Sequence, residues 1–334
     1  GADAKAPALL GTDSTTAPSE GEDSAACSSF SGCWPEVRAA IGCSRVFTFE
    51  DLQLGECISR GESAVVCRGT IRRSQREVVV KMQHDDGHHQ SGGSRPAKEL
   101  ATEIALVASL SHPRLVTFAG ACLETFRLAL VTELAPGGNL HHALHVRKRM
   151  LQRHEQFQLA TDFLEGVRYL HARQPPVAHL DLKSMNLVLD ADGQHLQICD
   201  FGLAREIGPL KDGETGPRTC AGSPRYMAPE CHDCGYGPVT EQADLWASGC
   251  VLVELFGRCL PYAECSNVQQ IVNEMLVHQR SPAVPDGVES AVQGIIESML
   301  VFDAQSRLPA AQALSQLHLA ATCSGNGSRF RWVP

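Results

Sequence analysis

The chain has 334 residues, a formal net charge of −9 at pH 7 and a sequence pI of about 5.9. This acidic balance excludes the overall basic field that attracts a nucleic-acid backbone, so we expect no nucleic-acid partner. The length favours a two-lobed fold with a sizeable core and flexible ends over several independent domains.

The 14 cysteines indicate reduced thiols that fill core positions. Five of them lie in apolar segments: Cys57, Cys67, Cys122, Cys199 and Cys250. Cys231 and Cys234, beside His232, resemble a metal half-site, but no second half-site follows at zinc spacing. Structural zinc is therefore disfavoured.

The two ends have the composition of segments without a packed core. Residues 1–45 are rich in small and acidic residues and have hardly any apolar periodicity, which predicts a disordered leader. Residues 323–334 are predicted to be a tail. The chain begins at Gly1 without a signal peptide, which predicts a fragment of an intracellular, cytoplasmic protein.

Short valine- and leucine-rich runs between glycines and charged turns predict antiparallel strands in the first part of the chain. The runs lie around residues 52–54, 65–66, 78–80, 116–118 and 128–132. The polar segment 84–95 contains three histidines and two aspartates, but its adjacent glycines favour a solvated loop over a metal site. The stretch from Glu99 to Leu110 has the apolar spacing of one helical face.

Pro136, Gly137 and Gly138 break the strand pattern, and helices are predicted from there on. Their predicted ranges are 152–171, 244–256, 268–278, 288–301 and 310–319. The longest apolar-rich stretch, residues 246–256, is far short of the roughly 20 residues that a membrane-spanning helix needs. It predicts a buried helix, and we expect no membrane span.

Several motifs follow one another in a fixed order. Residues 179–186 read HLDLKSMN, 200–202 read DFG, 228–230 read APE and 244–249 read DLWASG. Their order and spacing resemble the catalytic segment of protein kinases. The resemblance implies an α+β, bilobal protein kinase fold, with a small β-rich N-lobe that contains one main helix and a larger helical C-lobe.

The same resemblance divides the chain. It implies a kinase domain over residues 46–322, with the N-lobe at about 46–132, the hinge at about 133–138 and the C-lobe at about 139–322. The resemblance itself covers about residues 49–320.

The resemblance also implies a role for each polar residue of the motifs. Asp181 is expected to orient and deprotonate the acceptor hydroxyl, and Lys183 to neutralise the transferred phosphoryl group. Asn186 and Asp200 are expected to hold Mg²⁺, which prefers oxygen ligands together with substrate phosphates.

Upstream, residues 78–81 (VVVK) resemble the kinase strand whose lysine contacts the α- and β-phosphates of ATP. Lys81 is then expected to pair with Glu103 on the following helix. Glu99, one turn earlier, is the competing carboxylate.

The segment that corresponds to the glycine-rich nucleotide loop departs from the family pattern. When residues 66–69 are aligned with the family's VYRG, the three loop glycines fall on Ser59, Gly61 and Ala64. Loss of two glycines is expected to reduce nucleotide affinity or loop freedom. The residues implied to contact the nucleotide are Ile58, Ser59, Gly61, Ala64, Val66, Val79, Lys81, Thr132, Glu133 and Ala135.

Lys183 and the stretch 222–230 (GSPRYMAPE) resemble serine/threonine kinases, most of all the tyrosine-kinase-like group that includes Raf and the mixed-lineage kinases. HLDLK is also similar to Mos. Ser223 in the acceptor loop is implied to bond Asp181 and Lys183.

Leu180 stands where most kinases have an arginine, so the chain resembles a non-RD kinase. A phosphate on the possible phosphosites Thr215 or Thr219 then lacks its usual charge partner. Glu230 and Arg307 match a structural ion pair of the family, and Asp244 matches a residue that braces the catalytic loop.

The motifs together favour a serine/threonine protein kinase that uses ATP and Mg²⁺ and has protein substrates. The alternative is a pseudokinase that acts as a nucleotide-binding scaffold or regulator, which the altered nucleotide loop and Val79 favour. A small-molecule phosphotransferase is disfavoured because the APE loop is intact. The residues predict neither the identity of the substrate nor an oligomeric state.

Overall fold

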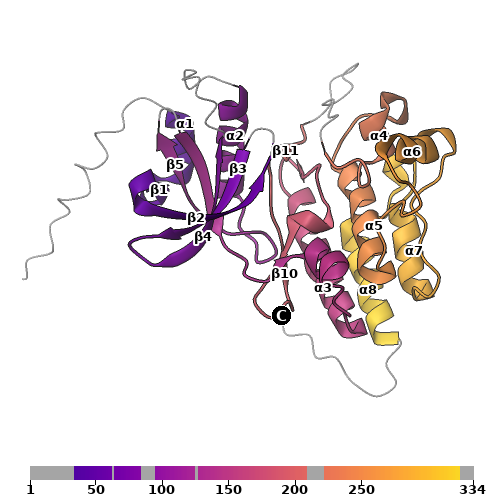
Figure 1. Cartoon of the computed structure of the whole chain (residues 1–334). Helices are drawn as coiled ribbons and strands as arrows, with labels where there is room; N and C mark the ends of the chain where they lie inside the picture. The colour runs from indigo at the N-terminus through magenta and orange to yellow at the C-terminus, as the bar shows by residue number, and fades with distance from the viewer. Residues whose placement is uncertain (1–33, 62–63, 84–94, 125–126, 209–221, 324–334) are drawn as a thin grey trace, which may run out of the picture.

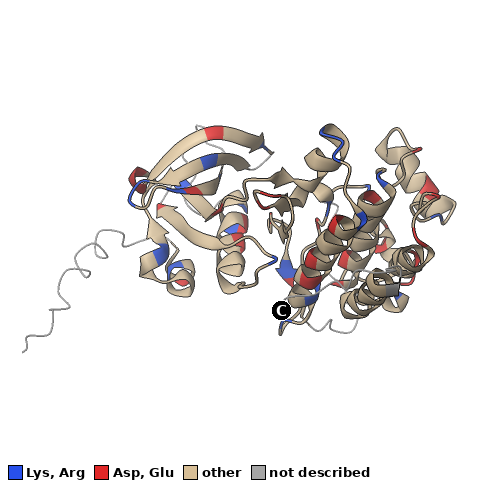
Figure 2. Ribbon diagram, turned by 90° about the horizontal axis from the view of Figure 1, so that it is seen from below, with Lys and Arg blue, Asp and Glu red and all other residues tan. Residues whose placement is uncertain are grey.

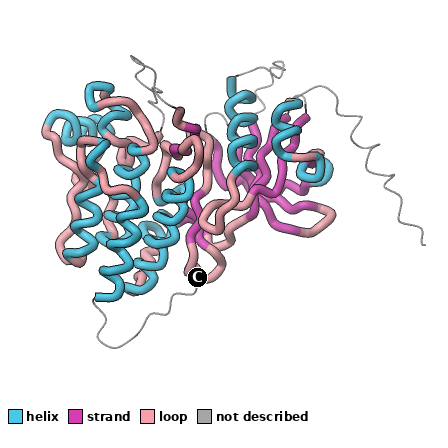
Figure 3. Tube along the Cα trace, turned by 180° about the vertical axis from the view of Figure 1, so that it is seen from behind, coloured by secondary structure: helices cyan, strands magenta, loops and turns pink. Residues whose placement is uncertain are grey.

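The computed structural model describes residues 34–61, 64–83, 95–124, 127–208 and 222–323. Most strands gather in one part of the molecule and most helices in the other, as Figures 1 and 3 show. The predicted α+β fold, with a β-rich N-lobe and a larger helical C-lobe, is confirmed. Residues 1–33 of the predicted leader, Thr215, Thr219 and residues 324–334 of the predicted tail lie outside the described residues.

A six-stranded sheet with the order β1-β5-β6-β4-β3-β2 forms most of the N-lobe. Its strands are β1 (Val46–Phe47), β2 (Leu52–Arg60), β3 (Ala64–Ile71), β4 (Arg76–Gln83), β5 (Phe118–Glu124) and β6 (Arg127–Glu133). Neighbours are antiparallel except β1 and β5. Side chains alternate along β4, so Val78 and Val80 are fully buried while Val79 and Lys81 belong to the other face.

Helix α2 (Arg95–Ser109) packs against β4, β5 and β6. Leu100, Ile104 and Val107 form its buried face at helical spacing. Glu103 is only 5% exposed and is the one charged residue among the buried residues of this helix. A buried carboxylate is costly unless it is paired, so its position requires a cationic partner.

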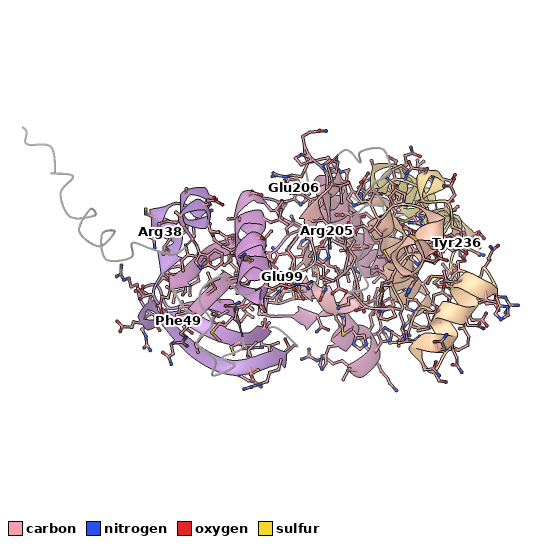
Figure 4. The ribbon with its side chains drawn as sticks, turned by 90° about the horizontal axis from the view of Figure 1, so that it is seen from above. Arg38, Phe49, Glu99, Arg205, Glu206 and Tyr236 are labelled. Atoms are coloured by element: carbon pink, nitrogen blue, oxygen red, sulfur yellow. The ribbon has the colours of Figure 1, made fainter. Side chains whose placement is uncertain are left out.

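A short helix lies in the segment for which composition predicts disorder. Helix α1 (Pro35–Ile41) contacts α2, and its buried Val37 and Ile41 belong to the same apolar cluster as Leu100. Figure 4 shows α1, which carries Arg38, beside α2, which carries Glu99. The expected disorder through residue 45 is therefore wrong for this part. Two apolar residues are too few to stabilise an isolated helix, and the surface of α2 supplies the missing contacts.

The C-lobe is built from α3 (Arg153–His171), α4 (Pro229–His232), α5 (Gln242–Gly257), α6 (Val268–Val272), α7 (Ser290–Met299) and α8 (Ala310–Cys323). Helix α5 contacts α3 and α7 and is buried over most of its length, with Trp246 and Leu252 fully inaccessible. It contains the predicted buried helix. The predicted helix at 268–278 is α6 followed by a π-helical turn, Asn273–Val277. No helix within the described ranges is both long enough and apolar enough to cross a membrane.

Five short strands position the loops that carry the motifs: β7 (Gly138–Asn139), β8 (Val177–Ala178), β9 (Leu187–Leu189), β10 (Leu196–Ile198) and β11 (Arg205–Glu206). Strands β7, β9 and β10 form one antiparallel sheet, and β8 pairs with β11. Residues 179–186 form the loop between β8 and β9, and Asp200 follows β10. The predicted hinge, residues 133–138, runs from the end of β6 to the start of β7.

The cysteines differ in burial more than the sequence predicts. Cys67, Cys122 and Cys250 are buried, in agreement with a core role. Cys57 is exposed, and its prediction as a core thiol is wrong. The reason is that β2 is an edge strand in which only Leu52 is buried.

Candidate active site

Lys81 on β4 joins α2 to the segment that follows β10. Its Nζ lies 2.8 Å from Oε1 of Glu103 and 2.7 Å from Oδ1 of Asp200. The competing Glu99 instead pairs with Arg95, with 2.8 Å between Oε1 and Nε. Three segments that are far apart in sequence therefore meet at one ammonium group, and Glu103 is the carboxylate that reaches it.

The charges at this contact follow from burial and proximity. Burial lowers the pKa of Lys81, but the carboxylates of Glu103 and Asp200 outweigh it and raise the pKa well above its ordinary value. Burial raises the pKa of Asp200, and the ammonium of Lys81 outweighs this effect and lowers it. Burial raises the pKa of Glu103 more than Lys81 lowers it. Lys81 and Asp200 are therefore ionised at neutral pH.

Asp181, Lys183 and Ser223 form a closed hydrogen-bonded triangle. Lys183 Nζ lies 2.6 Å from Oδ2 of Asp181 and 2.8 Å from Oγ of Ser223. The Ser223 hydroxyl donates to Oδ1 of Asp181 at 3.2 Å. Asn186 completes the group, since its Nδ2 donates to the main-chain oxygen of Asp181 at 2.9 Å and to Oδ2 at 3.0 Å. The structure thus brings the catalytic-loop residues and the acceptor-loop serine together.

A buried carboxylate on α5, that of Asp244, anchors the backbone of the catalytic loop. Asp244, 1% exposed, accepts main-chain N–H bonds from His179 at 2.7 Å and from Leu180 at 2.8 Å. Leu180 has a positive φ of 62°, which costs of order 1–3 kcal/mol for a residue other than glycine. Asp244 offsets this strain, because charged hydrogen bonds to buried N–H groups are among the stronger ones.

A second buried carboxylate of α5 was not predicted. Glu254 is fully buried and accepts hydrogen bonds from Ser184 and Tyr226, each at 2.7 Å, while Nε2 of His145 lies 2.7 Å from Oε2. The catalytic loop, the acceptor loop and the turn after β7 thereby share one anchor. The available signal was a glutamate within the apolar-rich stretch 246–256.

The acceptor loop is anchored at its other end as well. The guanidinium of Arg307 donates to both oxygens of Glu230, at 2.6 and 2.7 Å, and both side chains are almost fully buried. Arg225 donates to the main-chain oxygens of Pro261, Tyr262 and Cys265. These contacts fix the loop that follows Ser223.

One face of the sheet carries half of the residues implied to contact nucleotide. Val66 lies opposite Lys81, and Val79 lies opposite Thr132, so these side chains share a face. Ser59 lies opposite Val66 and extends the face onto β2.

The remaining predicted nucleotide residues lie around this face. The Gly61 N–H donates to the main-chain oxygen of Ala64 at 2.9 Å. Ile58 is 51% exposed, Ala135 lies in the connection after β6, and Glu133 forms an ion pair with Arg76. Residues 62–63 lie outside the described residues.

Asp200, beside Lys81, and Asn186, in the catalytic loop, have oxygen atoms of the kind that a magnesium ion binds. Asn186 directs its amide nitrogen to Asp181, which turns its amide oxygen away from that contact. Asp200 uses Oδ1 for Lys81, and its side chain is 46% exposed. A Cβ atom at Gly202 would lie 3.0 Å from the Lys81 Nζ, so the glycine leaves the space beside these groups. One amide and one carboxylate oxygen beside bound phosphates suit Mg²⁺.

The sequence of the chain has many relatives among known proteins. The protein kinase domain family matches residues 52–319. The probable serine/threonine-protein kinase SIS8 of Arabidopsis thaliana is 30% identical over 270 residues, which are 80% of this chain and 25% of that protein. The dual specificity protein kinase shkC of Dictyostelium discoideum is 30% identical over 251 residues, 74% of this chain and 47% of that protein.

The serine/threonine-protein kinase CTR1 of Arabidopsis thaliana is 32% identical over 250 residues, 74% of this chain and 29% of that protein. The chain thus spans less than half the length of these relatives. A match that runs through both lobes, to a family whose motifs form the loops after β8 and β10, shows that the chain belongs to the protein kinase family.

Proposed function

We propose that the chain is a serine/threonine protein kinase domain that transfers the γ-phosphoryl group of ATP, with Mg²⁺, to hydroxyl groups of proteins. The observation that carries the proposal is the hydrogen-bonded set of Asp181, Lys183, Asn186 and Ser223. Phosphoryl transfer requires mainly positioning and charge stabilisation, and this set supplies a base and a cation in fixed positions.

In this proposal Asp181 accepts the proton of the attacking hydroxyl. Its Oδ2 accepts from Lys183 and Asn186 and its Oδ1 accepts from Ser223, so the carboxylate meets an incoming hydroxyl without first reorienting. Lys183 then stabilises negative charge that develops on the transferred group. Mg²⁺, when bound through Asn186 and Asp200, supplies positive charge to the phosphates.

Lys81 binds the α- and β-phosphates in the same proposal. Its ammonium lies between two carboxylates and is held in place from both lobes. Val66, Val79 and Thr132 would cover the adenine from the sheet, and Glu133 and Ala135 would line its edge.

Serine and threonine are the proposed acceptors because Lys183 contacts the acceptor-loop Ser223. The names of SIS8 and CTR1 describe serine/threonine kinases, whereas shkC is named a dual specificity kinase. Acceptor analysis therefore has to include tyrosine. A cytoplasmic location is part of the proposal, because the reaction consumes ATP.

The pseudokinase alternative is not favoured. The proposal is supported by the presence of Lys81, Glu103, Asp181, Asn186 and Asp200, each of which is hydrogen-bonded to another polar side chain of the site. The altered nucleotide loop changes backbone freedom, and it removes none of these groups.

The test is transfer of labelled γ-phosphate from Mg-ATP to the chain and to a generic protein substrate, followed by phosphoamino-acid analysis. Asp200→Asn and Asp181→Asn serve as inactive variants, and Glu99→Gln serves as a matched carboxylate control outside the site. Phosphoserine or phosphothreonine that is lost in both inactive variants supports the proposal. Absence of transfer by the wild type, with nucleotide binding retained, favours the pseudokinase.

A further inference from the structure

Two cysteines face each other across β2 and β3, the hairpin that carries Ser59 and Val66. Cys57 and Cys67 are directly opposite in the antiparallel register. Residues that are directly opposite have Cα atoms about 4.5 or 5.5 Å apart. Disulfides span Cα distances of about 4.4–6.8 Å, so the backbone permits a bond between these two sulfurs.

The register also explains why the thiols lie on the same face. The pairing shifts by one residue on each side of Cys57. In a regular ladder Ser59 would pair with Val65, but it pairs with Val66. The shift places Ser59 on the nucleotide face of the sheet and leaves Cys57 with Cys67 on the opposite face.

The two thiols differ in accessibility. Cys57 is exposed on the edge strand, whereas Cys67 is 8% exposed. Burial raises the pKa of Cys67, and the neighbouring Cys57 raises it further. The Cys57 thiol donates to the main-chain oxygen of Ser59, with 3.4 Å between Sγ and O. An exposed thiol beside a second cysteine is the arrangement found in redox-sensing pairs.

We propose that Cys57 and Cys67 are a redox modification site at which a peroxide forms a cross-strand disulfide. The Cys57 thiolate attacks a peroxide oxygen, the O–O bond breaks, and Cys57 becomes a sulfenic acid as one water leaves. The Cys67 sulfur then displaces the oxygen from Cys57 as a second water. The two thiols lose two electrons and two protons, and one hydrogen peroxide is reduced to two waters.

The consequence for nucleotide binding follows from the bulged backbone and rests on the proposed kinase function. Disulfide formation brings the Cβ atoms to about 3.8 Å, which is closer than in an ordinary opposite pair. The irregular segment around Cys57 adjusts most easily, and Ser59 lies two residues away. Oxidation is therefore expected to raise KM for ATP several-fold and to leave kcat nearly unchanged, because Lys81 and Asp181 lie on other segments.

The first test does not depend on kinase activity. The full chain is treated with hydrogen peroxide, blocked with N-ethylmaleimide, digested without reductant and mapped by mass spectrometry. We expect a peptide pair linked through Cys57 and Cys67 that disappears on reduction. The pair is expected to be absent in Cys57→Ser and retained in the matched control Cys234→Ser, which removes another exposed cysteine.

The proposed disulfide would be contradicted if Cys57 were found only as a sulfinic acid, or bonded to a different cysteine or to a second chain. The second test compares KM for ATP before and after oxidation in the wild type and in Cys57→Ser. An unchanged KM in a fully disulfide-bonded wild type would overturn the coupling to the nucleotide loop. A chain inactive even when reduced would refute the kinase function and leave the peptide map as the test of the disulfide.

Discussion

Lys81 and Asp200 are separated by 119 positions in the sequence, and 2.7 Å separates Nζ of the first from Oδ1 of the second. The contact links β4 of the N-lobe to the segment after β10, and Glu103 holds the same ammonium from α2. The position of α2 therefore determines whether Lys81 is held for phosphate binding.

Glu103→Gln is expected to lower kcat/KM for ATP by about tenfold to a hundredfold, since the amide no longer holds the ammonium of Lys81 by charge and small displacements of catalytic groups are costly. Glu99→Gln is the matched control, because Glu99 is on the same helix and pairs with Arg95 at the surface. Steady-state kinetics with varied ATP provide the measurement. An equal loss in the two variants would contradict the assignment of Glu103.

Glu254→Gln is expected to lower the free energy of unfolding by about 1–3 kcal/mol, because the amide presents one acceptor in place of a buried carboxylate that receives several hydrogen bonds. Tyr226→Phe removes only one of the donors to Glu254 and should lower the free energy of unfolding by less. Urea unfolding monitored by tryptophan fluorescence measures both. A larger loss for Tyr226→Phe would show that Glu254 is not the shared anchor.

Ile41→Asp is expected to release α1 from α2, since it introduces a charge at a position that is 6% exposed. Amide hydrogen exchange across residues 95–109 should then accelerate by about tenfold or more, and phosphoryl transfer should fall as Glu103 loses its fixed position. Ala39→Asp adds the same charge at an exposed position of α1 and should change neither quantity. Unaltered exchange in Ile41→Asp would mean that α1 does not support α2.

Burial and the neighbouring Asp200 together raise the pKa of the Cys199 thiol to about 12, and Lys81 offsets only part of this rise. Because the thiolate is the reactive form, alkylation of Cys199 by iodoacetamide should accelerate about tenfold per pH unit between about pH 7 and about pH 10 without levelling off. The alkylation rate of glutathione, whose thiol has an ordinary pKa, should stop rising above about pH 9. Peptide mass spectrometry at several pH values gives both rates, and an early plateau at Cys199 would contradict the effect of burial.

Thr215→Ala and Thr219→Ala are each expected to change activity less than about twofold, because Leu180 provides no charge for a phosphate on either residue. Both threonines lie outside the described residues, and the prediction rests on Leu180 alone. Activity is measured on protein whose phosphorylation state is known from intact mass. A large gain that depends on either phosphothreonine would refute the proposed independence from this charge pair.

Much of the site was predictable because its chemistry is concentrated in short motifs. Asp181, Lys183 and Asn186 lie within one loop, so their spacing in the sequence already limits their distances in space. The helix α3 was predictable to within one residue, because its apolar positions repeat at helical spacing.

Other features could not be predicted from short stretches of the sequence. Helix α1 has too few apolar residues for its periodicity to indicate a helix, and its stability comes from α2. The shared contacts of Glu254 join residues 145, 184 and 226, whose proximity no sequence spacing encodes. Cys57 and Cys67 are opposed only because the register shifts between Leu54 and Cys57, and such shifts depend on how both strands pack.

The sequence by itself determined the family, the two-lobed fold and the identity of the polar residues in the active site, because these depend on residue type and on spacing within short segments. Only the tertiary structure decided that Glu103 reaches Lys81 while Glu99 pairs at the surface, that α1 packs on α2, and that Glu254 anchors two loops. Each of these requires that groups distant along the chain come within a few ångströms, and that proximity is produced by the packing of whole elements.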